Sequence, residues 1–358
     1  MKSYRCFLVG LVACLCLQAS AQWTFVSLHP DSVESSCAQH IDSDLTIVGY
    51  VDNADTRYGA MWTGTTRECL YLNPVVSMSA EVTSSANRHQ IGLIYAMGWL
   101  EHAALWEGNA ESFVDLHPDG AFCSNISDTN GTTHVGAVNF DGLAFHACAW
   151  TPEGLRDITP DGASEAWAIG IYQQSIVGTA VFGERFHAML WQGDQAIDLN
   201  PSGCRESIVQ GATADCQIGW TGNFYSGDQR AVIWHGSPES FVDLQPPNHQ
   251  TSWAVAGSGN LQVGQVDNRA ALWNGSAATY VDLQCFLPSE YGMGSASGIY
   301  RQPNGTCYIV GTSQNRNGYP EAWLLVGRPV FPSPTKSPRV APPSSRISAV
   351  PAVGARQE

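Results

Sequence analysis

A short phrase that ends in tryptophan recurs along the chain and restricts the possible folds more than any other feature of the sequence. Its first six copies end at Trp62, Trp106, Trp150, Trp191, Trp234 and Trp273, at intervals of 44, 44, 41, 43 and 39 residues. In each copy an alanine precedes the tryptophan by two or three positions, and a degenerate seventh copy ends at Trp323. A period of this length indicates a repeat architecture in which each copy is one supersecondary unit.

Three other patterns keep step with the tryptophan phrase. The first pattern has an aspartate at its centre in five of its six copies, which are Leu70-Tyr71-Leu72, Val114-Asp115-Leu116, Arg156-Asp157-Ile158, Ile197-Asp198-Leu199, Val242-Asp243-Leu244 and Val281-Asp282-Leu283. A further copy, Val26-Ser27-Leu28, precedes the first tryptophan phrase and has no tryptophan phrase of its own. The second pairs an aliphatic residue with glycine, as in Val177-Gly178. The third is a run of small residues, as in residues 164–169. Each repeat therefore holds four short β-rich runs separated by turn residues.

Four strands in about 40–45 residues, repeated seven times, predict an all-β, seven-bladed β-propeller of four-stranded blades over residues 22–327. In this prediction the small-residue run is the innermost strand a, the Val-Gly run is strand b, the tryptophan phrase is strand c and the Asp-centred run is strand d. The chain then begins with a lone strand d and ends with strands a, b and c. We expect the N-terminal strand to complete the last blade and close the ring, because closure removes exposed sheet edges.

The tryptophan phrase resembles that of the extracellular HAF-repeat proteins, named for a His-Ala-Phe triplet followed by a short Trp-containing strand. The His-Ala pair stands at 102–103, 146–147 and 187–188, whereas the third position is Ala104, Cys148 or Met189 and never phenylalanine. Arginine replaces the histidine at Arg230 and Arg269. The resemblance covers nearly all of residues 23–327. It implies a secreted or surface-associated propeller and supplies no catalytic residue.

The two ends of the chain differ from the repeats. Residues 1–21 have basic residues, an apolar run and Ala19-Ser20-Ala21, the layout of a cleavable secretory signal. The alternative is lipoprotein processing at Cys14. Residues 328–358 are rich in proline and basic residues, which predicts a disordered tail. No other segment is long and apolar enough for a membrane span, so we expect a secreted, extracellular or periplasmic protein, and a monomer.

Charge and cysteine content narrow the class of protein further. The net charge of −15, with lysine only at Lys2 and Lys336, argues against a nucleic-acid partner. Eight cysteines remain beyond the signal, and an even count in an exported protein favours disulfides, although pairing of Cys204 with Cys216 would have to cross a whole strand. Some of the thiols are then free. No Cys-x-x-Cys spacing occurs, so no metal site is predicted from the cysteines.

Residues that recur in every blade are interpreted as architecture, and function is sought where the copies differ. His102, His146 and His187 occupy equivalent positions in successive blades, which the ring separates, so we expect them to hold neighbouring turns rather than share one metal ion. The loops that connect strands d to a and b to c share one face, where aromatic residues alternate with carboxylates. Such a face is either a solvated acidic surface or a site for a sugar or peptide ligand.

The candidate ligand-binding residues on this face are aromatic, acidic or without a counterpart in other copies: Trp99, Glu101, Asp119, Asp161, Trp167, Tyr225, His249 and Trp253. Trp167 and Trp253 interrupt the small-residue rule of strand a and are either channel filler or a stacking platform. His249 is the best candidate for acid–base chemistry. No catalytic residue is assigned, because none of the common catalytic motifs occurs.

Two functions follow from this sequence. The first is a secreted, non-catalytic binding module that takes a carbohydrate or protein ligand on the loop-rich face. The alternative is a calcium-dependent hydrolase or lactonase with channel-mouth carboxylates as calcium ligands and His249 as base. This alternative rests on analogy of fold alone. If the source glycosylates its proteins, the acceptors on the opposite face are Asn130, Asn274 and Asn304.

Overall fold

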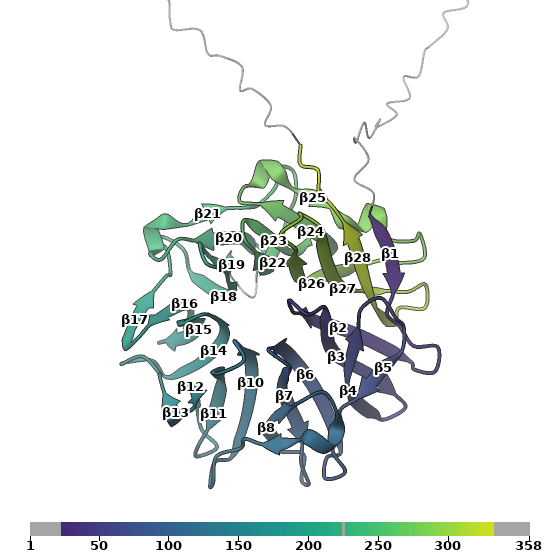
Figure 1. The fold of residues 1–358 in the computed structure, drawn as a ribbon. Coiled ribbons are helices and arrows are strands. Elements are labelled where there is room, and N and C mark those ends of the chain that lie inside the picture. The colour runs from purple at the N-terminus through teal and green to yellow at the C-terminus, as the bar shows by residue number, and fades with distance from the viewer. Residues whose placement is uncertain (1–22, 224–225, 333–358) are drawn as a thin grey trace, which may run out of the picture.

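The computed structural model describes residues 23–223 and 226–332, which form a ring of seven four-stranded antiparallel sheets (Figure 1). The predicted seven-bladed β-propeller is confirmed. The expected signal at 1–21 and most of the expected tail lie outside the described residues. Residues 328–332 are described, and Phe331 packs against the apolar core between the last two blades.

The blades follow chain order, each from its innermost to its outermost strand. Blade 1 holds β2 (Ser35–Ile41), β3 (Thr46–Asn53), β4 (Thr56–Thr63) and β5 (Cys69–Tyr71), and blade 2 holds β6 (Ser79–Ala86), β7 (His89–Tyr95), β8 (Glu101–Trp106) and β9 (Val114–Asp115). Blade 3 holds β10 (Cys123–Thr129), β11 (His134–Asn139), β12 (Phe145–Thr151) and β13 (Gly154–Asp157), and blade 4 holds β14 (Glu165–Tyr172), β15 (Ser175–Phe182), β16 (Arg185–Gln192) and β17 (Gln195–Asp198).

The remaining blades repeat this order. Blade 5 holds β18 (Glu206–Ala212), β19 (Gln217–Gly222), β20 (Arg230–Trp234) and β21 (Val242–Asp243), and blade 6 holds β22 (Ser252–Ser258), β23 (Leu261–Val266), β24 (Arg269–Asn274) and β25 (Val281–Asp282). Blade 7 holds β26 (Gly294–Arg301), β27 (Cys307–Gln314), β28 (Pro320–Gly327) and β1 (Thr24–Ser27). The 3-10 turns are η1 (Ala110–Ser112), η2 (Pro238–Ser240), η3 (Ala277–Thr279) and η4 (Leu283–Phe286), and no helix of the described residues could cross a membrane.

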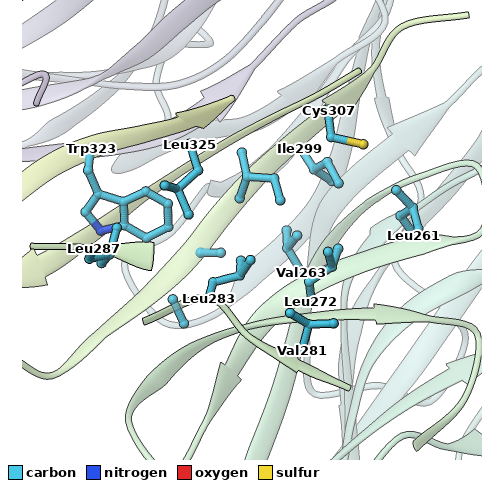
Figure 2. Packing of buried hydrophobic residues seen from close by; sticks show 13 residues of the cluster. Leu261, Val263, Leu272, Val281, Leu283, Leu287, Ile299, Cys307, Trp323 and Leu325 are labelled. Atoms are coloured by element: carbon cyan, nitrogen blue, oxygen red, sulfur yellow. The ribbon is translucent and has the colours of Figure 1, made fainter. Parts of the chain in front are cut away.

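The N-terminal strand closes the ring, as the sequence predicts. β1 pairs antiparallel with β28, so that Thr24 lies opposite Val326 and Ser27 opposite Trp323. Figure 1 shows the two strands side by side at the outer edge of blade 7. The seam next to it is filled by an apolar cluster that includes Trp323, Leu325 and Leu272, and Figure 2 shows these side chains packed between blades 6 and 7.

The repeated tryptophans fill the spaces between blades. Trp62, Trp106, Trp234, Trp273 and Trp323 are fully buried. The Trp62 indole Nε1 donates a hydrogen bond of 2.9 Å to the Leu28 carbonyl oxygen of the preceding strand d, and Trp191 donates in the same way to Ile158. Trp62, Trp150 and Trp191 therefore contribute both apolar burial and a polar link to the neighbouring blade, whereas the buried Nε1 atoms of Trp106, Trp234 and Trp273 have no hydrogen-bond partner within the described residues.

A β-bulge interrupts every innermost strand at the same place, and it explains the Val-Gly phrase. The residues that bulge are Gln39, Thr83, Ser127, Ile169, Gln210, Val255 and Ser297, and all seven line a central channel of about 160 Å³. The strand-b glycine lies opposite the bulge, where a Cβ atom on Gly178 would stand 2.0 Å from the Trp167 carbonyl oxygen. Only glycine permits this approach of the two backbones.

Candidate functional site

The repeated His-Asp or Arg-Asp pairs build the blades rather than a site. His146 Nδ1 lies 2.7 Å from Asp157 Oδ2, and His187 Nδ1 lies 2.7 Å from Asp198 Oδ2. In later blades Arg269 Nε donates to Asp282 at 2.8 Å. The second carboxylate oxygen of each aspartate accepts a backbone N–H two residues further on, which holds the turn into the next blade. This agrees with the architectural interpretation of the repeated residues.

The channel is lined by the bulging residues and by residues that follow them in the innermost strands. Seven residues that precede the bulges border what we name the mouth, on the face that carries the d–a and b–c loops. They lie two positions before each bulge, on the same side of their strands, and all are at least partly exposed: Cys37, Glu81, Asn125, Trp167, Ile208, Trp253 and Ser295. The border is divided by chemistry. Its polar side chains come from blades 7, 1, 2 and 3, and its large apolar side chains come from blades 4, 5 and 6.

Ion pairs between blades 1 and 2 define the polar side of the mouth. Arg57 lies over the Tyr50 ring, 3.6 Å from its centroid, and donates to Asp52 and Glu81, each at 2.9 Å. Gln39 donates to the other oxygen of Glu81. Arg57 is therefore the cation at the centre of an otherwise acidic cluster.

The sequence-predicted Glu101 extends the polar side into blade 3. Its two carboxylate oxygens lie 3.5 Å from Tyr95 Oη and 3.5 Å from Asn125 Nδ2. Burial, and then the negative charges of Glu101 and Glu81, raise the pKa of Tyr95. The mouth thus brings together two carboxylates and two amides, whereas the sequence supplied only a list of acids.

The aromatic side of the mouth contains Trp167 and Trp253. The Trp167 ring is held between Phe145 and Phe186, with centroid separations of 5.9 and 6.5 Å. Trp253 is 38% exposed. Trp167 thus fits the filler interpretation better, whereas Trp253 keeps enough free surface to contact a ligand.

An exposed apolar surface, which we name the apolar crest, lies beside the polar side of the mouth. It consists of exposed side chains on four loops of the same face: Val75, Val76, Met78, Met97, Trp99, Phe122, Phe140 and Leu143. Met97 is 87% and Leu143 82% exposed. Backbone hydrogen bonds from Met78 to Tyr95 and from Phe122 to Asn139 tie the loops together in pairs.

Sequence reasoning found Trp99 and missed most of the crest. The missed signal is a departure from the repeat, because Val75-Val76 follows Asn73-Pro74 where other copies have Asp31-Ser32, Asp119-Gly120 or Asp161-Gly162. An aspartate in such a turn is readily hydrated at the protein surface, whereas two valines that no other residue covers expose apolar side chains to water. Trp99 itself adopts a φ of 65° and lies 6.3 Å from the Tyr95 ring.

His249 is not brought to the channel mouth. Its Nδ1 lies 2.7 Å from Asp267 Oδ2, and its ring meets Tyr280, next to the outermost strand of blade 6, edge-on at 5.3 Å. Burial acts to raise the pKa of Asp267, but hydrogen bonds from Thr251, His249 and Gln250 leave this pKa below its ordinary value. The His249–Asp267 pair ties a d–a loop to a b–c loop.

The other candidates are dispersed. Asp119 is exposed on the loop between blades 2 and 3, Asp161 lines a cavity at the outer rim, and Tyr225 lies outside the described residues. Among residues 23–223 and 226–332 no group of three His, Cys, Asp or Glu side chains could hold a metal ion. The calcium-dependent alternative therefore has no carboxylate cluster of that size to rest on in the described part of the chain.

The structure does not support the disulfides expected from the even cysteine count. All eight cysteines are free thiols: Cys37, Cys69, Cys123, Cys148, Cys204, Cys216, Cys285 and Cys307. Burial raises the pKa of Cys148 to about 12, which keeps that thiol protonated.

Of the three predicted glycan acceptors, Asn130 has a structural role. Its Nδ2 donates to the Gln173 carbonyl oxygen at 2.7 Å, and its Oδ1 accepts from Thr132 and Thr133. A glycan on Nδ2 would compete with that bond. Asn304 is exposed and Asn274 half-buried, and glycosylation at these positions stays a prediction.

No family model and no curated protein matches the sequence. Among solved structures, the chain is similar to a puromycin hydrolase with a TM-score of 0.53 and 9% identity, over 82% of this chain and 52% of that one. A puromycin-hydrolyzing peptidase of Mycobacterium tuberculosis gives 0.49 and 14%, over 78% and 50%, and TolB of Acinetobacter baumannii gives 0.43 and 8%, over 84% and 66%.

The likeness shows the fold alone. The chain spans about half to two thirds of the length of these solved proteins. Because one fold serves many unrelated functions, a function has to be inferred from this chain's own surface.

Proposed function

We propose that the protein is a secreted, non-catalytic interaction module that binds a protein partner on its loop-rich face. The apolar crest carries this proposal, because many exposed apolar side chains on neighbouring loops of one face are typical of protein-binding sites. The acidic cluster around Glu81 and Glu101 adjoins the crest and favours a partner with a basic rim around an apolar centre. Secretion rests on the sequence of residues 1–21.

We also propose that the chain is an extracellular HAF-repeat protein. The support for this membership is the His-Ala pair of three successive blades, in which each imidazole contacts the aspartate of strand d. A substitution of that histidine by arginine keeps the contact, as Arg230 and Arg269 do. The departures of this chain from the repeat are therefore compatible with the same blade.

The experiment places a photo-crosslinking amino acid at Met97, with Glu153 on the opposite face as the control position. The full chain is exposed to the secreted proteins of its source, and cross-linked products are identified by mass spectrometry. We expect a product from position 97 that is absent from position 153 and is lost in the double variant Val76→Glu, Met97→Glu. The variant Glu153→Lys should retain it. Products that survive the double variant would contradict the proposal.

The same protein is titrated with oligosaccharides, and with calcium in the presence of ester and lactone substrates. If a sugar binds the parent chain but not Trp253→Ala, the ligand is a carbohydrate and the proposal of a protein partner is wrong. Calcium-dependent turnover would support the hydrolase alternative instead. Ligand at 100 times its dissociation constant stabilises the fold by about 2.7 kcal/mol, which a thermal melt detects.

A further inference from the structure

A cavity lies away from the channel, at the outer rim between blades 3 and 4. Its volume is about 610 Å³, and its apolar lining includes Ile158, Phe182, Met189 and Trp191. Ala196, on the outermost strand β17 and exposed, also lines it. We name this space the rim cavity.

The equivalent space in two other blades is filled by an aromatic side chain of the protein itself. Ala196 lies directly across the β16–β17 pair from Trp191. At the same register Phe113 packs on Trp106 in blade 2, with ring centroids 5.9 Å apart, and Tyr280 packs on Trp273 in blade 6 at 6.1 Å. Blade 4 therefore keeps the tryptophan, Trp191, but has alanine at the position from which blades 2 and 6 supply an aromatic ring, and the rim cavity lies at that position.

Trp191 lines the rim cavity, and its Nε1 has no free hydrogen for a hydrogen bond to a ligand. Trp191 Nε1 already donates to the Ile158 carbonyl oxygen at 2.7 Å. The indole of Trp191 is 3% exposed, so an aromatic occupant would contact this remaining free area together with the half-buried side chains of Ile158 and Phe182. Tyr280 and Phe113 show that a ring at this position fits the blade.

Carboxylates surround the opening of the rim cavity. Asp157, Asp194 and Asp198 are paired with His146, Arg156 and His187 respectively. Asp161 lines the same space, is exposed, and has no hydrogen-bond or ion-pair partner within the described part of the chain. A cation next to the bound ring would therefore meet an unpaired carboxylate.

We propose that the rim cavity binds an aromatic ring that carries a short alkylammonium group. The ring takes the place that Tyr280 and Phe113 occupy in their own blades, and the ammonium group faces Asp161. This site is separate from the apolar crest, so its occupation does not depend on the proposed protein partner.

The test is calorimetric titration of the full chain with tyramine at low salt. We expect one-to-one binding to the parent chain, at least tenfold weaker binding to Ala196→Tyr, and unchanged binding to Ala196→Ser and to the crest variant Met97→Glu. The parent chain should bind 3-phenylpropionate, which has the opposite charge, at least threefold more weakly than tyramine. Asp161→Asn should bind tyramine at least threefold more weakly than the parent chain does. Tyramine that binds the parent and Ala196→Tyr equally, or fails to bind the parent, would overturn the proposal.

The melting temperature of Ala196→Tyr shows independently whether an aromatic ring fits in the rim cavity. If the rim cavity is equivalent to the space around Tyr280, the ring of Ala196→Tyr fills it and the melting temperature rises by about 2–4 °C. A lower melting temperature in Ala196→Tyr and Ala196→Phe alike would mean that no ring fits beside Trp191, and the inference would then be wrong.

Discussion

At the scale of single residues, the same amino acid has different roles according to whether it recurs. Trp106 has a counterpart in every blade and is fully buried, whereas Trp99 has no counterpart and is 62% exposed. The sequence predicted the burial of the repeated tryptophans because their period matches the blade. It did not predict the His249–Asp267 contact, since a contact between two loops leaves no periodic signal.

A pair of tryptophan variants tests this distinction. Trp106→Ala should lower the free energy of unfolding by about 3–5 kcal/mol, because it removes a buried indole and leaves a cavity. Trp99→Ala is the control and should change it by less than about 0.5 kcal/mol. Urea denaturation followed by circular dichroism measures both. Equal stabilities of the two variants would contradict the assignment of Trp106 to the space between blades.

At the scale of the element, the innermost strand explains a pattern that the sequence displayed without a cause. The Val-Gly phrase was predicted to be strand b, but its glycine was not predicted to face a bulge. Seven bulges at one register turn alternate side chains toward the channel, and they place Glu81 and Trp253 at its mouth. The candidate site was therefore predictable as a set of strands and loops, but not as a division into polar and aromatic sides.

Gly178→Ala tests the bulge. The added Cβ atom would stand 2.0 Å from the Trp167 carbonyl oxygen, so the two strands must separate. We expect a loss of about 2–4 kcal/mol in unfolding free energy, measured by urea denaturation. Gly292→Ala is the matched control, because its nearest neighbour would be 3.7 Å away, and it should be almost neutral. A neutral Gly178→Ala would show that the bulge does not constrain this position.

At the scale of the whole molecule, one buried and two half-buried histidines link stability to pH. Burial lowers the pKa of His29 and His117, and burial followed by the neighbouring His89 lowers the pKa of His134 from its ordinary value of 6.5 to about 4. An unfolded chain then binds more protons than the folded ring between pH 6.5 and 4. Stability is therefore complete above this window and falls as the pH decreases through it.

His134→Gln tests this linkage. A full shift of the pKa of His134 corresponds to about 3 kcal/mol, as one pKa unit is worth about 1.4 kcal/mol. Melting temperatures between pH 7 and 4 should fall less steeply for His134→Gln than for the parent, whatever the absolute stability of the variant. The exposed His235→Gln serves as the control and should keep the parental slope. Parallel slopes for all three proteins would contradict the role of His134.

The closure of the ring by β1 has a consequence for how the protein is made. β1 is the first strand of the ring to leave the ribosome, and the strand with which it pairs, β28, is the last. Blades 1 to 6 can form during synthesis, because each is continuous in the chain, but blade 7 waits for translation of the ring to finish. Until then the innermost strand of blade 1 has no neighbour on one side. The final step of assembly therefore joins segments about 300 residues apart, and long-range pairings of this kind form slowly.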